Sequence, residues 1–92
     1  MKVQWADRAL LDLEDLLGFI ALDDPAAARR LYARVFRKTD KLKAFPDLGP
    51  VSREAGEPFR EVIVKPLRIL YLHEARCVTI VAVVRAEADL QA

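Results

Sequence analysis

The Asp-Asp-Pro sequence at residues 23–25 divides one long helix-forming stretch of the chain into two. Asp24 is a good N-cap, because its carboxylate can accept a backbone N–H at a helix start. Pro25 suits the first helical position, where no amide hydrogen is needed. The break therefore predicts helices at about residues 7–22 and 25–44. Because the link between them is so short, we expect them to pack antiparallel as a hairpin.

Both predicted helices carry apolar side chains at helical spacing, which indicates one buried face on each. Asp7 is the expected N-cap of the first helix. Asp12, Glu14 and Asp15 are expected to lie on its solvated surface. The expected buried faces comprise Leu10, Leu13, Leu17 and Ile20 in the first helix and Ala28, Leu31, Tyr32, Val35, Thr39 and Leu42 in the second.

Four segments have the alternation or the β-branched content of strands. One is residues 3–5, and three follow a loop at residues 45–58: residues 59–64, 67–73 and 77–84. Short turns separate the last three strands, which predicts an antiparallel meander. The last strand is almost continuously apolar, which favours a central position. These elements predict an α+β fold of two layers, with the helical hairpin covering one face of the sheet.

The composition excludes several classes of protein. A chain of 92 residues has room for a single domain, residues 1–92. Cys77 is the only cysteine and His73 the only histidine, so we expect no disulfide within the chain, no metal site and no cofactor. No apolar run is long enough to span a membrane, and the N-terminus turns polar too early for a signal peptide. We therefore expect a cytoplasmic protein with no membrane partner.

The net charge of +1 conceals an uneven distribution of charge along the chain. Acidic residues predominate from residue 7 to 24, and basic residues from 29 to 43. A protein that binds nucleic acid directly usually has a larger excess of positive charge, and the basic helix lacks interleaved exposed aromatic side chains. Direct nucleic-acid binding is therefore disfavoured. A solvated helix face, or a surface that docks an acidic protein segment, fits the pattern better.

Six short motifs follow one another in a fixed order along almost the whole chain. They are Val3-Gln4-Trp5, Asp24-Pro25-Ala26-Ala27-Ala28, Leu42 to Gly49, Phe59-Arg60-Glu61-Val62, Arg68-Ile69-Leu70-Tyr71 and Val81 to Val84. Their order and spacing resemble the RelE/ParE superfamily of type II toxin–antitoxin toxins. The resemblance implies a two-layer RelE/ParE-like fold and a cognate antitoxin, ParD-like or of another kind. The expected assembly is a toxin–antitoxin hetero-oligomer.

The superfamily has two main branches with different targets. RelE-like toxins are ribosome-dependent endoribonucleases, whereas ParE-like toxins inhibit DNA gyrase without cleaving nucleic acid themselves. RelE-like toxins often end the last strand with a histidine and a basic pair. Here Arg85 takes the place of the histidine, and Glu87 and Ala88 replace the basic pair. Arginine stays charged and is a poor proton shuttle. The chain is therefore closer to the ParE-like branch, with DNA gyrase as the expected target.

Three arginines are the expected target-binding residues: Arg60, Arg68 and Arg85. For a gyrase inhibitor no catalytic residue is predicted. One alternative is a RelE-like mRNA interferase, in which the three arginines converge on one concave surface and act in catalysis. Another is a degenerate relative that binds its antitoxin and poisons nothing. Each arginine also has an alternative interpretation, structural for Arg60 and Arg68 and a solvated strand end for Arg85.

The expected antitoxin-binding residues are one aromatic and three basic side chains. They are Trp5, Arg30, Arg34 and Arg37. Three other residues have chemistry of their own but are interpreted structurally. His73 is expected at a strand end, Cys77 as a small core residue, and Tyr71 as a packing residue in mid-strand.

Overall fold

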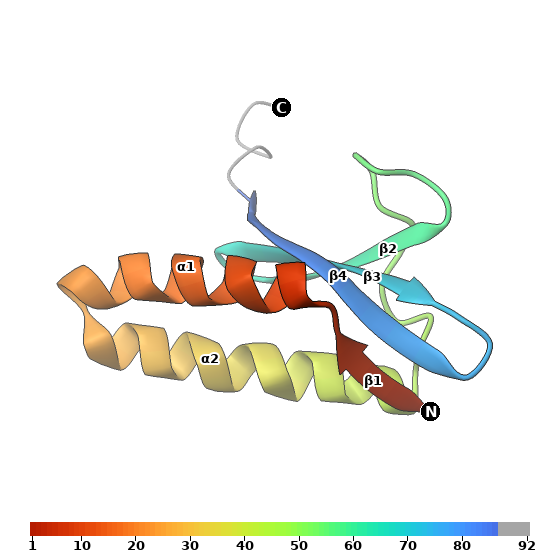
Figure 1. Ribbon diagram of the computed structural model, residues 1–92, viewed down its shortest axis with the longest axis horizontal. Helices are drawn as coiled ribbons and strands as arrows, with labels where there is room; N and C mark the ends of the chain where they lie inside the picture. Colours follow the sequence, from red (N-terminus) through yellow and green to blue (C-terminus); the bar gives the residue numbers. More distant parts are fainter. Residues whose placement is uncertain (87–92) are drawn as a thin grey trace.

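A four-stranded sheet and a helical hairpin form the two layers of the computed structural model, which describes residues 1–86 (Figure 1). In chain order the elements are β1 (Lys2–Trp5), α1 (Asp7–Asp23), α2 (Pro25–Asp40), a 3-10 turn (Lys41–Lys43), β2 (Phe59–Val64), β3 (Leu67–His73) and β4 (Cys77–Arg85). The predicted α+β fold is confirmed. The second helix is shorter than predicted, because its last predicted turn is of the 3-10 kind. Within residues 1–86, no helix is long and apolar enough to cross a membrane.

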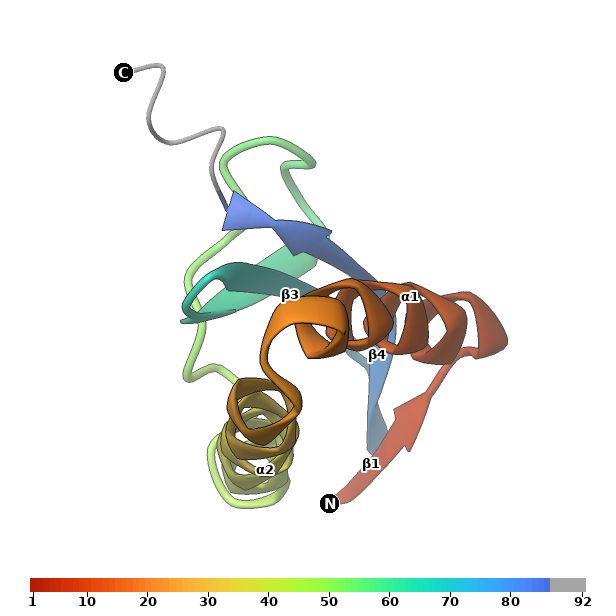
Figure 2. The same cartoon turned by 90° about the vertical axis from the view of Figure 1, so that its left-hand side faces the viewer.

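The helical hairpin forms as the Asp24-Pro25 pair predicts. The Asp24 carboxylate accepts a hydrogen bond from the Ala27 N–H at 3.0 Å, and Pro25 is the first residue of α2. The two helices pack side by side on one face of the sheet (Figure 2). The prediction that Asp7 caps α1 is wrong. Ala6 occupies the N-cap and Asp7 begins the helix, where its charge still favours the positive end of the helix dipole.

The sheet has the strand order β1-β4-β3-β2. Strands β2, β3 and β4 are antiparallel neighbours, which confirms the meander, and β4 is central as predicted. However, β1 pairs parallel with β4, so the sheet is mixed. The sequence of the four-residue strand β1 does not indicate which strand it pairs with or in which direction. Its place follows from the chain itself, because β1 runs straight into α1, which packs on β4.

A β-bulge lets β4 present more of its apolar side chains to the helices than strict alternation allows. Tyr71 of β3 pairs with Ile80, but Leu70 pairs with Ala82, so one extra residue stands in β4. Ile80 and Val83, three residues apart, are therefore both buried in the same core. That core comprises Ala9, Leu13, Leu31, Val35, Leu42, Val62, Val64, Leu67, Ile69, Tyr71, Val78, Ile80 and Val83.

Asp12 joins α1 to the bulged strand. Its Oδ2 accepts a hydrogen bond from the Val83 N–H at 3.1 Å, and its Oδ1 pairs with Arg8 Nε at 3.0 Å. The prediction of a solvated Asp12 is therefore wrong, since only 20% of its side chain is exposed. The bulge supplies the physical reason, because Asp12 satisfies a backbone donor beside the irregular position.

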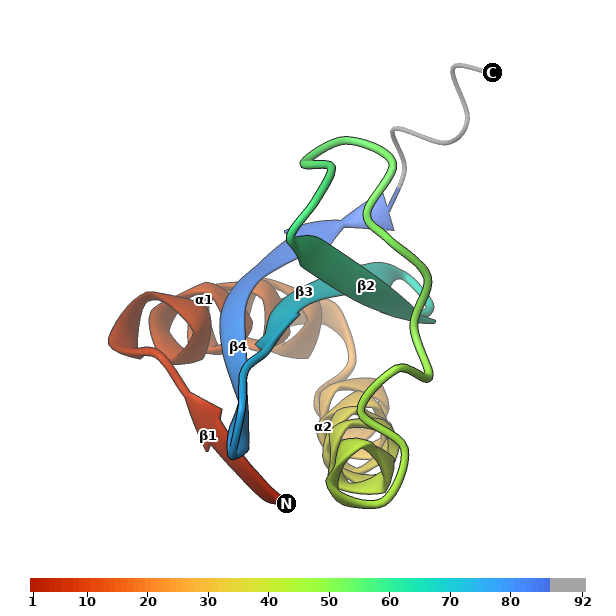
Figure 3. The same ribbon diagram turned by 90° about the vertical axis from the view of Figure 1, so that its right-hand side faces the viewer.

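The long segment between α2 and β2 runs along the outer side of β2 (Figure 3). Val51 forms an isolated antiparallel bridge with Arg60. Backbone bonds from Ser52 N to Phe59 O and from Glu61 N to Pro50 O continue this contact. The segment therefore covers the first half of the β2 edge and brings its own side chains against the sheet.

Candidate functional site

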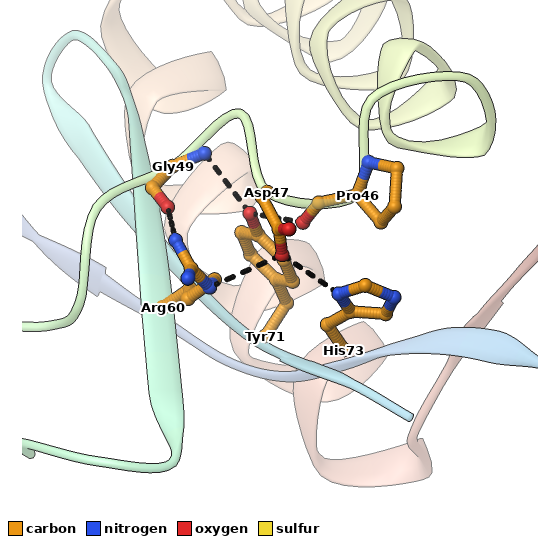
Figure 4. A network of polar contacts seen from close by, with 6 residues as sticks. All are labelled: Pro46, Asp47, Gly49, Arg60, Tyr71 and His73. Carbon is orange, nitrogen blue, oxygen red and sulfur yellow. Dashed lines mark hydrogen bonds and ion pairs between the residues drawn. The ribbon is translucent and has the colours of Figure 1, made fainter. Parts of the chain in front are cut away.

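Arg60 lies where the segment 46–49 crosses the start of β2 (Figure 4). Its Nη1 donates to the Gly49 carbonyl oxygen at 2.6 Å, and its Nε lies 3.5 Å from Asp47 Oδ1. The same carboxylate oxygen lies 2.7 Å from His73 Nδ1 at the end of β3. Asp47 therefore joins a cation from one strand to the imidazole of the next.

Tyr71 of β3 holds the segment 46–49 against the sheet through its hydroxyl group. Its side chain is fully buried, and its hydroxyl donates to the Pro46 carbonyl at 2.7 Å. The hydroxyl also accepts the Gly49 N–H at 2.9 Å. The prediction that Tyr71 packs in mid-strand is confirmed, but its hydrogen bonds were not foreseen. Together, Tyr71, Arg60 and His73 fasten the segment to β2 and β3.

Burial raises the pKa of the Tyr71 hydroxyl above its ordinary value of 10.0. The bond from Gly49 and the charge of Arg60 lower this pKa, and Asp47 raises it, but desolvation is the largest effect. The folded protein therefore holds this proton more tightly than the unfolded chain does. The protonated Tyr71 hydroxyl therefore contributes to the stability of the folded protein. This contribution is fully present below pH 10 and is lost as the pH rises through the raised pKa of the folded state.

Tyr71→Phe is expected to destabilise the protein by about 1–3 kcal/mol at neutral pH, because it leaves the Pro46 carbonyl and the Gly49 N–H without their buried partner. The variant also loses the Tyr71 contribution to the decline in stability above pH 10. Urea unfolding at neutral and alkaline pH measures both effects. Tyr32→Phe is the matched control, because Tyr32 is 54% exposed. Equal stability of the two variants would contradict the anchoring role.

Arg68 lies on the other face of the sheet from Arg60. Glu61, the neighbour of Arg60 in β2, pairs with Arg68, and alternate residues of a strand point to opposite faces. Only 4% of the Arg68 side chain is exposed, and its Nε lies 3.1 Å from Glu61 Oε2. Glu54 forms a second ion pair with Arg68 Nη1, and Ser52 Oγ donates to Glu61 Oε1 at 2.8 Å. Arg68 thus ties the segment before β2 to the sheet.

Arg85 ends β4 opposite Leu67 and is exposed. The structure therefore does not gather the three predicted arginines on one surface, since Arg60 and Arg68 point to opposite faces. The convergence expected for a nuclease is wrong for this pair, because each of the two arginines instead binds the segment that crosses its own face of the sheet. The sequence-predicted contact region also includes the tail after Arg85, of which residues 87–92 lie outside the described residues.

The four predicted antitoxin-binding residues occupy two regions. Trp5 is half-buried and stacks on Phe36 of α2, with ring centroids 5.0 Å apart. Arg30, Arg34 and Arg37 are exposed on α2, at the spacing that places residues along one side of a helix. Arg34 Nη2 also donates to the Lys65 carbonyl at 3.0 Å, which connects α2 to the β2–β3 turn.

One further side chain, Cys77, differs from its sequence-based prediction as a small core residue. Cys77 is half-buried at the start of β4 rather than a core residue, because its partner strand β1 lies at the sheet edge. Its Sγ lies 3.8 Å from Glu74 Oε1. Over residues 1–86, no group of three or more His, Cys, Asp or Glu side chains is arranged to hold a metal ion.

Sequence reasoning missed the acceptors that surround the arginines. Asp47 and Gly49 are separated from Arg60 by more than ten residues, and Glu54 lies 14 residues before Arg68. The Pro-Asp-Leu-Gly composition of residues 46–49 indicated only a turn. No local sequence pattern shows that such a turn folds back on the sheet. The only sequence signal for these contacts was a turn segment followed by two strands that carry arginines.

An N-terminal strand, a helical hairpin and an antiparallel meander follow one another in this structure, in the order that the resemblance to RelE/ParE-like toxins implies. A family model described as the ParE toxin of the type II toxin–antitoxin system parDE matches residues 3–90. The chain therefore belongs to the ParE toxin family.

Two curated proteins are similar to this chain. Toxin RelE2 of Caulobacter vibrioides is 32% identical over 74 residues, which cover 80% of this chain and 81% of that protein. The putative toxin Y4kP of Sinorhizobium fredii is 36% identical over 52 residues, 56% of this chain. That match spans only 54% of Y4kP, about half its length.

Two solved structures have a similar fold. A chain of the chromosomal ParDE TA system from P. aeruginosa superposes with a TM-score of 0.81 at 16% identity, covering 95% of this chain and 97% of that one. The conserved hypothetical protein HP0894 of Helicobacter pylori gives a TM-score of 0.59 at 20% identity, covering 92% and 93%. At these identities the likeness concerns the fold.

Proposed function

We propose that this toxin inhibits DNA gyrase by binding, in the cytoplasm, and that a cognate antitoxin neutralises it. The toxin engages gyrase and favours its DNA-bound, cleaved state. The match to the ParE toxin family supports this target. Arg85 at the exposed end of β4 and Arg60 are the proposed target contacts. Arg68, the third predicted target contact, is only 4% exposed and paired with Glu61 and Glu54, so it has a structural role in this proposal. The proposed antitoxin contacts are Trp5, Arg30, Arg34 and Arg37.

The placement of Arg60 and Arg68 is the observation that carries the proposal. Cleavage of RNA without a metal needs groups that move protons and groups that stabilise phosphate charge at one point. The buried Arg68 is paired with Glu61 and Glu54, and Arg60 lies on the opposite face. A binding mechanism requires no such convergence, so it fits this distribution better.

Purified toxin is expected to accumulate covalent gyrase–DNA cleavage complexes when it is mixed with gyrase, ATP and supercoiled plasmid. Arg85→Ala is expected to lower the yield of these complexes, because it removes the exposed cation at the end of β4. Arg76→Ala is the matched control, since Arg76 is exposed in the turn at the other end of β4. Unchanged gyrase activity at saturating wild-type toxin would overturn the proposal.

A second candidate is a ribosome-dependent mRNA interferase, and two observations favour it. One relative is named RelE2. In addition, the Asp47 carboxylate holds His73 Nδ1 while it also pairs with Arg60, an arrangement that orients an imidazole for proton transfer. This candidate predicts mRNA cleavage on translating ribosomes, abolished by His73→Ala. A degenerate toxin would show neither activity and would let cells grow after induction without antitoxin.

A further inference from the structure

A groove separates α2 from the free half of the β2 edge. It has a volume of about 430 Å³, and its lining residues are Arg34, Arg37, Lys38, Lys41, Ile63, Val64 and Lys65. A second hollow of about 240 Å³ continues along the same strand to the segment Leu48–Pro50 and shares Lys38 and Ile63 with the first. The two hollows together follow the edge of β2 from its last residues back to the crossing segment.

The charge of the larger hollow has one sign. Every charged residue that lines it is basic: Arg34, Arg37, Lys38, Lys41 and Lys65. The one acid in the smaller hollow, Glu61, is paired with Arg68. Ile63 and Val64 provide an apolar surface between these cations, and Ile63 is 39% exposed. The groove therefore suits an occupant that is both acidic and partly apolar.

The backbone of β2 offers hydrogen bonds inside this groove. Phe59 and Glu61 direct their backbone groups to the outer edge, where they bond to Ser52, Gly56 and Pro50. Because strand residues alternate, Ile63 directs its N–H and C=O to the same edge. No backbone hydrogen bond within residues 1–86 joins these two groups of Ile63 to the crossing segment. The edge of β2 is thus closed beside Glu61 and open beside Ile63.

We propose that this groove docks an extended acidic segment of the antitoxin, which adds to the sheet as a short strand beside Ile63. The segment exchanges both backbone hydrogen bonds with Ile63, and its carboxylates pair with Lys38, Lys41 and the arginines of α2. This mode of binding is strand addition, with the backbone supplying affinity and the flanking cations supplying selectivity. The identity of the partner rests on the proposed function, but the chemistry of the groove does not.

The groove fits nucleic acid and a second copy of the chain less well. None of its lining residues is aromatic, so bases find no stacking platform. An unpaired strand edge matches the backbone of a peptide rather than a phosphate chain. If a second copy of the chain paired through the same β2 edge, its basic groove residues would face those of the first copy. Such contact between like charges is unfavourable.

The experiment uses the full chain with the antitoxin, taken as the product of the neighbouring gene. Hydrogen exchange at the Ile63 amide is expected to slow on binding, by at least about tenfold. Lys38→Glu with Lys41→Glu is expected to weaken binding by about tenfold or more, and the loss should shrink at high salt. Arg76→Glu is the matched control, because it changes one exposed charge far from the groove. The antitoxin could instead bind without slowing hydrogen exchange at the Ile63 amide, and could bind the Lys38→Glu, Lys41→Glu variant as tightly as the wild type. That result would overturn the proposed docking mode but leave the proposed function standing.

A peptide probe tests the groove independently of the antitoxin. A short capped peptide of alternating glutamate and valine is expected to bind the wild-type chain. The same peptide N-methylated at alternate residues, so that it cannot donate to the strand edge, is expected to bind at least about tenfold more weakly. Equal binding of the two peptides, or stronger binding of an anionic oligonucleotide, would reject strand addition. Concentration-dependent dimerisation that protects Ile63 would assign the edge to a second copy instead. If the peptide binds the groove but the antitoxin does not bind the toxin, the result would count against the proposed function.

Discussion

Replacing Arg68 by alanine is expected to destabilise the protein by about 3–5 kcal/mol, because it leaves Glu61 as a buried carboxylate without its cation. The loss is large since the Glu61 side chain is only 7% exposed and cannot recover its hydration. Glu54 and the segment before β2 lose their attachment in the same step. Urea unfolding of the variant measures the effect, and Arg76→Ala, at an exposed turn position, is expected to change stability by less than about 0.5 kcal/mol.

The double variant Arg68→Met with Glu61→Gln separates a structural role from target binding. It removes both charges of the buried pair, and the glutamine oxygen still accepts from Ser52. Removing both partners of a buried pair is much less damaging than removing one. We therefore expect the double variant to be more stable than Arg68→Ala and to remain toxic. A stable double variant that is not toxic would instead place Arg68 in contact with the target.

Gly49→Ala is expected to destabilise the protein by about 1–3 kcal/mol or more, because its new Cβ enters occupied space. A Cβ at this position would lie 2.2 Å from the Glu61 carbonyl oxygen and 2.8 Å from the Glu61 carbonyl carbon. Both atoms belong to the backbone, so no side-chain rotation relieves the clash. The segment must move, and the bonds of Gly49 to Tyr71 and Arg60 are then lost.

Gly18→Ala gives the matched control for this effect. A Cβ on Gly18 meets no atom within 4 Å, and the residue lies within α1. Alanine is the better helix former, so this variant is expected to be more stable by about 0.5–1 kcal/mol. Thermal unfolding of both variants checks the pair of predictions. Similar effects from the two substitutions would show that the segment 46–49 does not fit tightly against β2.

The elements of the fold that depend on local signals were predictable from the sequence. Asp24 and Pro25 marked the break in the hairpin, and the apolar run at residues 77–84 indicated the central strand. The parallel pairing of β1 was not predictable, because it depends on where α1 carries the chain. The contact between Asp12 and the Val83 N–H depends on a bulge that the apolar run concealed.

The candidate site was predictable only in part, for a related reason. Arg60 and Arg68 were identified as notable cations, but their partners come from a segment of irregular structure. Contacts of Asp47 with His73 and of Gly49 with Tyr71 span 22 residues or more along the chain. Strand alternation did contain one usable signal, because Glu61 next to Arg60 places the acid on the face opposite that arginine.

The most direct test of gyrase inhibition is pulse-labelling of cells in the first minutes after this toxin is induced without its antitoxin. DNA synthesis and protein synthesis are followed in the same culture, and Gly49→Ala serves as a destabilised control. The account predicts an early fall in DNA synthesis while translation continues. An early fall in translation while DNA synthesis continues would contradict it and would favour ribosome-dependent mRNA cleavage.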